Sequence, residues 1–242
     1  MHSLRAGRLR VDRHVQPRER LVQDERALDH LREGDAVARI EVEVEVVVFR
    51  PGQFISCLLP VGEERLIRPY SIASSPEEGD CLELVVDRVP GGPGSHYLFG
   101  LQIGATLRFT GPWGTFTLDR APAGEAVFIA DGTGIAPIRP MLRRALASAP
   151  THPLRLLHAG DGRAPPLYHE ELLQLARTNP AFTLDHVESR TLLREVCRRW
   201  IESDTDRTRH FFICGVGLIV PTLRDSLRQA GYARRAVQYE KW

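Results

Sequence analysis

The pattern of apolar residues changes near residues 120–125, and this change restricts the fold more than any other feature of the sequence. Before it, short β-rich runs alternate with turns built from Pro and Gly. After it, short buried-strand patterns alternate with stretches whose apolar residues recur at helical spacing. The chain therefore needs two separate cores, an all-β core first and an α/β core second.

The first half of the chain is predicted to form a small antiparallel β-barrel, which we assign to residues 35–120. Glu and Val alternate over residues 41–46, the period-2 pattern of a half-buried strand. Residues 1–34, where Arg is interleaved with acids, are predicted to form a mobile or partly ordered N-terminal arm. Further strands are predicted at residues 53–59, 69–74, 82–89 and 105–110.

The second half is predicted to form an α/β domain over residues 125–242. Strands that alternate with helices favour a parallel sheet with helices on both faces. Residues 121–124, with the sequence Ala-Pro-Ala-Gly, are the expected joint between the domains. The predicted strands lie at residues 127–130, 154–158, 182–187, 211–213 and 236–239. The predicted helices lie at residues 138–146, 167–177, 192–201 and 218–230.

Composition limits the chemistry that this chain can carry out. The formal net charge of +1 gives no reason to expect a nucleic acid partner. No run approaches 18 apolar residues, so we expect no membrane span and a cytoplasmic location. The four cysteines lack the spacing of a zinc site or of a plant-type iron–sulfur cluster, so we expect no metal. If the chain moves electrons, an organic cofactor must carry them.

A strand motif at residues 68–74 suits a ligand that has both a phosphate and a ring. Arg68 offers a guanidinium fork that pairs with two phosphate oxygens. Tyr70 lies two residues later and shares its face of the strand, while Ser71 points to the other face. Taken alone, this run is better explained as an ordinary strand that has an exposed Arg.

A Gly-rich run at residues 91–98 suits a phosphate through the backbone. Gly92 and Gly94 let N–H groups approach an anion, and Ser95 is predicted to begin a helix whose N-terminus favours negative charge. The alternative is a simple hairpin turn.

Two motifs in the second half follow predicted strands directly. Gly132 and Gly134 lie between a strand and a helix, and Pro137 suits the first helical turn, although the third glycine of the dinucleotide fingerprint is missing. Cys214 and Gly215 follow the strand at residues 211–213, where α/β sheets bind ligands. The alternative for Cys214 is a buried structural thiol.

The order of these motifs resembles the ferredoxin–NADP reductase-like superfamily, in particular bacterial ferredoxin reductases and oxygenase reductase components without an iron–sulfur domain. That family has R-x-Y-S, G-x-x-S, G-T-G-x-A-P and C-G motifs, often followed by a C-terminal aromatic residue. The resemblance covers about residues 35–242. It implies a two-domain fold, with an antiparallel β-barrel that binds FAD followed by an α/β parallel-sheet domain that binds NAD(P). This chain has the motifs, in the same order, at residues 68–71, 92–95, 132–137, 214–215 and 242.

The resemblance implies a role for each motif residue in the barrel. Arg68 and Ser95 would hold the FAD pyrophosphate, and Tyr70 would stack against the isoalloxazine. Ser71 would hydrogen-bond near flavin N5. The other implied FAD contacts are Pro69, Val86, Val89, Gly92, Gly94, Thr133 and Trp242.

The resemblance also implies a site for NAD or NADP on the α/β domain. Cys214 would lie beside the nicotinamide ring, and Trp242 would cover the flavin face where that ring stacks. Glu240 belongs to the acid-x-aromatic ending of several family members. With Ser71, these three residues form the implied catalytic set. The remaining implied dinucleotide contacts are Gly132, Thr133, Gly134, Ile135, Pro137 and Gly215.

Three acidic or basic residues bear on the choice between NAD and NADP. Asp161 suits ribose hydroxyls and hence NAD, whereas Arg163 suits a 2′-phosphate and hence NADP, with Asp161 tipping the balance slightly towards NAD. Asp131 stands where the family usually has a small or neutral residue, and an unpaired carboxylate there would repel a pyrophosphate.

The resemblance therefore implies an FAD-dependent reductase that moves electrons between NAD(P)H and a separate protein acceptor, such as a ferredoxin or an oxygenase component. Two alternatives stay open. One is a non-catalytic electron-transfer subunit of a larger complex, and the other is a flavin reductase that releases reduced flavin.

Overall fold

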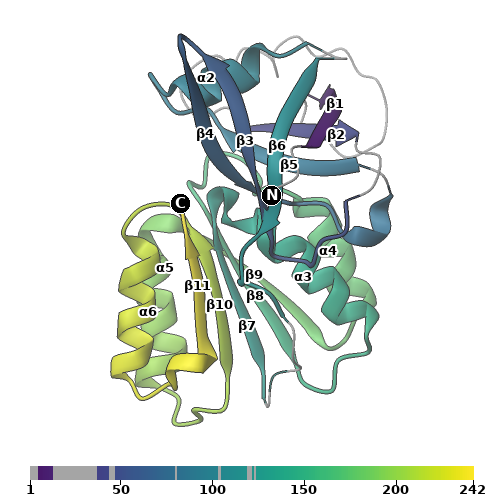
Figure 1. Ribbon diagram of the computed structural model, residues 1–242. Coiled ribbons are helices and arrows are strands. Elements are labelled where there is room, and N and C mark those ends of the chain that lie inside the picture. Colours follow the sequence, from purple (N-terminus) through teal and green to yellow (C-terminus); the bar gives the residue numbers. More distant parts are fainter. Residues whose placement is uncertain are drawn as a thin grey trace. The chain divides into compact units, whose positions relative to one another are not determined.

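The structure is a computed structural model, and it describes residues 5–12, 37–43, 47–79, 81–102, 105–118, 122 and 124–242. The chain divides into two compact units, Met1–Gly114 (unit 1) and Thr115–Trp242 (unit 2) (Figure 1). In the described ranges, no helix has the length and apolar character needed to cross a membrane.

Unit 1 is an antiparallel sheet that closes on itself. Its strand order is β4-β3-β6-β1-β2-β5, and each neighbouring pair is antiparallel. The two edges meet where Ile72 bridges to Leu84 and where the Ala73 N–H donates to the Glu83 carbonyl at 2.7 Å. The sheet is therefore a barrel, as expected. Its strands are β1 (Arg5–Asp12), β2 (Val37–Glu43), β3 (Phe54–Val61), β4 (Glu64–Ser71), β5 (Cys81–Asp87) and β6 (Thr106–Trp113).

The barrel core is made by the inward-facing residues of these strands. Fully buried side chains such as Ile40, Ile55 and Phe109 fill it. Helix α2 (Pro93–Gly100) follows β5 and contributes Leu98 to the same core. The helix is thus fixed against the barrel, and so is the turn at its start.

Unit 2 is a parallel sheet with the strand order β11-β10-β7-β8-β9. Helices α3 and α4 lie on one face, and α5 and α6 lie on the other (Figure 1). The strands are β7 (Ala126–Asp131), β8 (Leu154–Gly160), β9 (Phe182–Glu188), β10 (His210–Gly215) and β11 (Val237–Lys241). The helices are α3 (Ile135–Ala147), α4 (His169–Thr178), α5 (Leu192–Val196) and α6 (Ile219–Gln229).

Some predicted boundaries differ from the observed ones. The helix predicted at residues 192–201 is α5 followed by one π-helical segment, Cys197–Glu202. The chain divides before Thr115, earlier than the expected joint at residues 121–124, because Phe116 packs on Phe212 of unit 2 with ring centroids 6.3 Å apart. The predicted N-terminal arm contributes β1 to the barrel, while its residues 13–34 lie outside the described residues, as do residues 44–46 of the predicted strand.

An ion-pair network joins the strands of unit 2 near their amino ends. Glu125 accepts from Arg155 at 3.1 Å and from Arg209 at 2.6 Å. Asp185 accepts from Arg155 and from Arg199, both at 2.8 Å. These side chains are partly buried and share partners, so they hold β7, β8 and β9 in register more effectively than isolated surface pairs would.

Three histidines form a cluster between β8, β9 and the start of α4. His158 and His186 are register partners with ring centroids 5.8 Å apart, and His169 Nδ1 lies 3.1 Å from His186 Nε2. His158 is 1% exposed, and neither of its ring nitrogens has a hydrogen-bond partner among the residues that the structure describes. Burial, followed by the charges of His186 and His169, lowers the pKa of His158 to about 3. The fold therefore holds this ring in its neutral form.

Acidification from pH 7.5 to pH 5 is expected to destabilise unit 2. The folded pKa of His158 lies below the unfolded value of 6.5, so the unfolded chain takes up a proton first. The stabilisation is complete above pH 6.5 and is lost as the pH falls towards 3, with a loss of about 2 kcal/mol in unfolding free energy at pH 5. Urea unfolding across this range, followed by tryptophan fluorescence, measures the slope.

His158→Leu should flatten that slope, because leucine keeps an apolar side chain there and does not titrate. His152→Gln, which alters a histidine outside the cluster, should leave the slope as in the wild type. An equally steep loss of stability in His158→Leu would show that other groups cause it.

Candidate functional site

The Gly-rich turn of unit 1 lies against the strand that carries Arg68. A Cβ atom added to Gly94 would lie 3.2 Å from Arg68 Cγ and 3.4 Å from Leu59 Cδ1. The contact with Arg68 Cγ would be tighter than nine in ten real Cβ contacts, so a glycine at this position lets the turn approach β4 closely. Two motifs that are separate in the sequence thus meet on one side of the barrel.

The Ser95 hydroxyl stabilises this turn from within. Its Oγ accepts a hydrogen bond from the Val89 N–H at 3.1 Å and donates to the Gly92 carbonyl at 3.1 Å. The side chain is buried. Backbone N–H groups in the first turn of a helix have no partner within that helix, so the start of α2 favours an anion. The hydroxyl of Ser95 shapes this anion site by fixing the turn.

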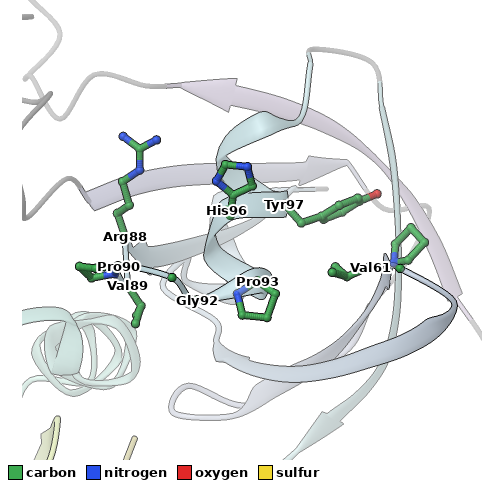
Figure 2. A pocket seen from close by; sticks show the side chains of 11 residues that line it. Val61, Arg88, Val89, Pro90, Gly92, Pro93, His96 and Tyr97 are labelled. Carbon is green, nitrogen blue, oxygen red and sulfur yellow. The ribbon is translucent and has the colours of Figure 1, made fainter.

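A cleft of about 730 Å³ opens beside the turn, and we call it the α2 cleft. Figure 2 shows His96 and Tyr97 of α2 between Arg88 on one side and Val61 on the other, with Gly92 at the turn. The cleft thus combines one cation and two ring side chains with backbone from a Gly-rich turn, groups that can contact the phosphates and rings of a nucleotide.

Ser71 and Tyr70 end β4 in two different environments. The Ser71 hydroxyl is buried and has no hydrogen-bond partner in the described part of the chain. A buried hydroxyl without a partner costs about 1–3 kcal/mol, and a hydrogen bond to a ligand atom would remove this cost. Tyr70 packs against the barrel core, and burial, followed by the Cys57 charge, raises the pKa of its phenol to about 12. Arg68 shares the face of Tyr70 and is exposed.

The other predicted barrel contacts lie in different surroundings. Val89 is 57% exposed at the rim of the α2 cleft. Val86 is buried in the barrel core opposite Ala38, so its side chain is not part of the cleft. Pro69 is exposed on β4. Unit 1 therefore brings together Arg68, Val89, Gly92, Gly94 and Ser95, whereas Thr133 and Trp242 belong to unit 2.

In unit 2 the turns after β7 and β10 are in direct contact. A Cβ atom on Gly134 would lie 2.1 Å from the Cys214 carbonyl oxygen and 2.7 Å from the Gly215 nitrogen, so no side chain fits there. A Cβ on Gly215 would lie 2.9 Å from Asp131 Cβ. The G-T-G turn and the Cys-Gly turn thus form one surface at the carboxyl ends of the parallel strands, where α/β sheets bind ligands.

The Cys214 thiol is held neutral at this edge. It is 1% exposed, and burial, followed by the charge of Glu240, raises its pKa far above the usual value. A side-chain hydrogen bond with Trp242 acts in the opposite direction. A buried, neutral thiol of this kind is a poor nucleophile.

The C-terminal residues are fixed next to Cys214. Glu240 is the register partner of Cys214 across β10 and β11. The Trp242 N–H donates to the Gly215 carbonyl at 3.2 Å, and the Gly217 N–H donates to Trp242 O at 3.2 Å. Three members of the predicted catalytic set therefore lie together on unit 2, while Ser71 lies on unit 1.

Asp131, which the sequence marks as unusual, has a specific partner. The Ser189 hydroxyl donates a short hydrogen bond to Asp131 Oδ1. Ser189 follows β9, so this bond links the end of β7 to the turn after β9. The carboxylate of Asp131 thus has a partner, but a neutral hydroxyl leaves its negative charge in place.

A second cleft of about 460 Å³ lies between the turns after β8 and β9, and we call it the β8/β9 cleft. Asp161 and Arg163, both predicted to bind the dinucleotide, line one side of it. Glu188, Ser189 and Arg190 line the other.

Sequence reasoning missed several residues of both clefts. Ser189 and Arg190 follow a predicted strand, and their place at its carboxyl end is the signal that was available. His96 and Tyr97 lie in the predicted helix, but only the position of α2 on the barrel shows which face they occupy. Ile135 and Pro137 begin α3 as predicted and are buried. In the described residues, no group of three or more His, Cys, Asp or Glu is arranged to hold a metal ion.

Comparison with known proteins agrees with this arrangement. The oxidoreductase FAD-binding domain family matches residues 33–118, and the oxidoreductase NAD-binding domain family matches residues 128–222. Ferredoxin–NADP reductase B of Sorangium cellulosum is 34% identical over 209 residues, which cover 81% of this chain and 86% of that protein.

Reductase components of oxygenase systems are also similar. That of a naphthalene 1,2-dioxygenase/salicylate 5-hydroxylase system from Ralstonia sp is 36% identical over 52% of this chain, and the match spans 37% of that protein. The cytochrome P450 reductase GcoB from Amycolatopsis has a TM-score of 0.75 at 25% identity, covering 100% of this chain and 71% of that one. The Plasmodium falciparum ferredoxin–NADP+ reductase has a similar fold, with a TM-score of 0.79 at 19% identity over 99% of this chain and 96% of that one.

A closed antiparallel barrel that matches an FAD-binding family, followed by a parallel α/β unit that matches an NAD-binding family, defines a two-domain flavoprotein oxidoreductase. The chain belongs to the ferredoxin–NADP reductase-like superfamily. As in that family, its cofactors are FAD and NAD(P), and it transfers electrons between NAD(P)H and a separate acceptor protein.

Gly134→Ala is expected to disrupt the dinucleotide surface of unit 2, because the added methyl group would overlap the Cys214 carbonyl. We expect dinucleotide binding to be lost and unit 2 to be destabilised by about 3 kcal/mol or more. Gly132→Ala is the matched control in the same turn. It has open space around its Cβ position but a φ of +55°, so it should cost only about 1 kcal/mol.

Calorimetric binding of NADH or NADPH, together with urea unfolding, measures both effects. Equal losses in the two variants would mean that backbone strain, and not the close approach to Cys214, explains why glycine is needed at Gly134.

Proposed function

We propose that this chain takes a hydride from a nicotinamide dinucleotide bound on unit 2 and passes the electrons singly to a ferredoxin or an oxygenase component in the cytoplasm. The observation that carries the proposal is the buried Ser71 hydroxyl, which lacks a protein partner in the described residues. A flavin ring atom close to Ser71 would satisfy it. The unpartnered hydroxyl supports our proposal that the redox cofactor contacts the barrel at Ser71.

The barrel residues fit FAD. Arg68 and the start of α2 would hold the pyrophosphate, because a guanidinium and helical N–H groups both favour an anion. Gly94 leaves the room in which the two can act together. The α2 cleft, with Arg88 and Tyr97, would take the rest of the nucleotide. When bound, FAD supplies the step from hydride to single electrons.

The edge residues of unit 2 would orient the nicotinamide nucleotide. Gly132 and Gly134 bring backbone N–H groups to the pyrophosphate, and Thr133 lies between them. Cys214 would contact the nicotinamide ring through a neutral, polarisable thiol. Trp242 would cover the ring's stacking position until the dinucleotide displaces it, and Glu240 would help to set the orientation of the C-terminal residues. Orientation of this kind can lower the activation free energy of a reaction by about 7–11 kcal/mol at best.

The acceptor is proposed to be a separate iron–sulfur protein. Residues 1–242 have no cysteine run with the spacing of a plant-type cluster, so such a one-electron centre would lie outside these residues. The names of the similar proteins, ferredoxin reductases and oxygenase reductase components, support the same class of acceptor.

Anaerobic mixing of the FAD-loaded chain with NADH and with NADPH tests the proposal. Bleaching of the flavin band by at least one donor is expected. Cys214→Ser should slow this bleaching about tenfold or more without loss of FAD, because the ring loses its polarisable contact. Cys197→Ser is the matched control on the π-helix and should behave as the wild type.

A yellow protein that neither donor bleaches would instead identify a non-catalytic subunit. A Cys214→Ser rate equal to that of the wild type would remove Cys214 from the site.

Ser71→Ala is expected to separate stability from function. Without FAD the variant should be as stable as the wild type or up to about 1 kcal/mol more stable, because a buried hydroxyl with no partner is removed. With FAD, flavin reduction should slow and the reduction potential should shift. Thermal unfolding of both forms and a spectroscopic redox titration provide the measurements, with Ser56→Ala on β3 as the control. A destabilised apo form would mean that the Ser71 hydroxyl has a structural partner.

A further inference from the structure

We propose that the β8/β9 cleft binds the adenosine ribose of a dinucleotide without a 2′-phosphate, so that the chain prefers NADH to NADPH. This inference rests on the proposed function, in which unit 2 binds the dinucleotide. It concerns the five side chains at the rim of the cleft and their link to Asp131.

The two walls of the cleft are held close together by the sheet. Gly160 at the end of β8 and Glu188 at the end of β9 are register partners. Across the opening, Glu188 Cγ lies 3.5 Å from the place of a Cβ on Gly162. The turn after β8 and the turn after β9 therefore present their side chains to the same small volume.

Both arginines of the cleft are paired with carboxylates of their own turns. Arg163 Nε lies 3.7 Å from Asp161 Oδ2, and the Arg163 N–H donates to Asp161 Oδ1 at 3.0 Å. Arg190 forms a close ion pair with Glu188. A phosphate that approached either guanidinium would meet a carboxylate beside it.

The hydroxyl of Ser189 is also engaged. It donates to Asp131, so a third carboxylate lies next to the lining residue Ser189. The two arginines and the three carboxylates, those of Asp161, Glu188 and Asp131, together give a formal charge of −1 around the site. Exposed ion pairs are weak and can rearrange, but the negative charge stays when a phosphate enters.

The chemistry of the two dinucleotides differs at this position alone. A ribose 2′-hydroxyl donates a hydrogen bond, and Asp161 or Glu188 can accept it. A 2′-phosphate only accepts at neutral pH, carries up to two charges and is repelled by the carboxylates. The paired arginines leave a site suited to a hydroxyl.

Flavin reduction by NADH and NADPH tests this inference. We expect kcat/KM to be about tenfold or more higher for NADH. Glu188→Gln and Asp131→Asn should each raise the NADPH/NADH ratio by about threefold to tenfold, because each removes one repelling charge. Glu202→Gln, a charge change away from the cleft, should leave the ratio as it is. Added salt should raise the ratio in the wild type by screening the repulsion.

Arg190→Ala tests the opposite assignment, in which the β8/β9 cleft binds a 2′-phosphate and the chain prefers NADPH. A large loss of NADPH efficiency in Arg190→Ala, or a wild type that prefers NADPH, would overturn the inference while leaving the proposed reductase function intact. Calorimetric binding of AMP and of 2′-phospho-AMP gives a readout that does not need the flavin. Tighter binding of AMP supports the inference even if neither dinucleotide bleaches the flavin, in which case only the proposed function fails.

Discussion

The contact between Gly134 and the backbone of Cys214 and Gly215 is the constraint on which the chemistry of unit 2 depends. The turn after β7 and the turn after β10 touch through their main chains, and for this reason no Cβ fits on Gly134. Backbone contacts have few alternative arrangements, so the two turns form one rigid surface. Gly215 in turn accepts the N–H of Trp242, which fixes the C-terminal residue against the same surface.

The two ends of the parallel sheet have different roles. Near the amino ends of the strands, Arg155 and its partners Glu125 and Asp185 make shared ion pairs that hold the register. At the carboxyl ends, short turns with glycines and small side chains leave room for ligands. The histidine cluster lies between the two, with His158 buried and His186 exposed. Register and ligand binding are therefore set by different residues, which lets the ligand turns vary while the sheet persists.

The sequence predicts the order of elements well because period-2 and helical patterns are local, and it predicts the motif residues because glycine and arginine have specific uses in turns and anion sites. The contact of Gly94 with Arg68 was beyond such reasoning, since it depends on how α2 packs on the barrel. Ser189 was missed because a single serine after a strand has no pattern of its own. The division before Thr115 follows from the packing of Phe116, which no linker composition reveals.

The Ser71 hydroxyl has a consequence for how this protein is maintained in a cell. A barrel with a buried, unsatisfied donor gains stability from its cofactor, and by mass action that gain grows with the logarithm of the free cofactor concentration. The folded fraction of newly made chains is thereby coupled to flavin supply. When flavin is scarce, apo chains unfold more often and are exposed to proteolysis, so the abundance of the protein would follow the nutritional state of the cell.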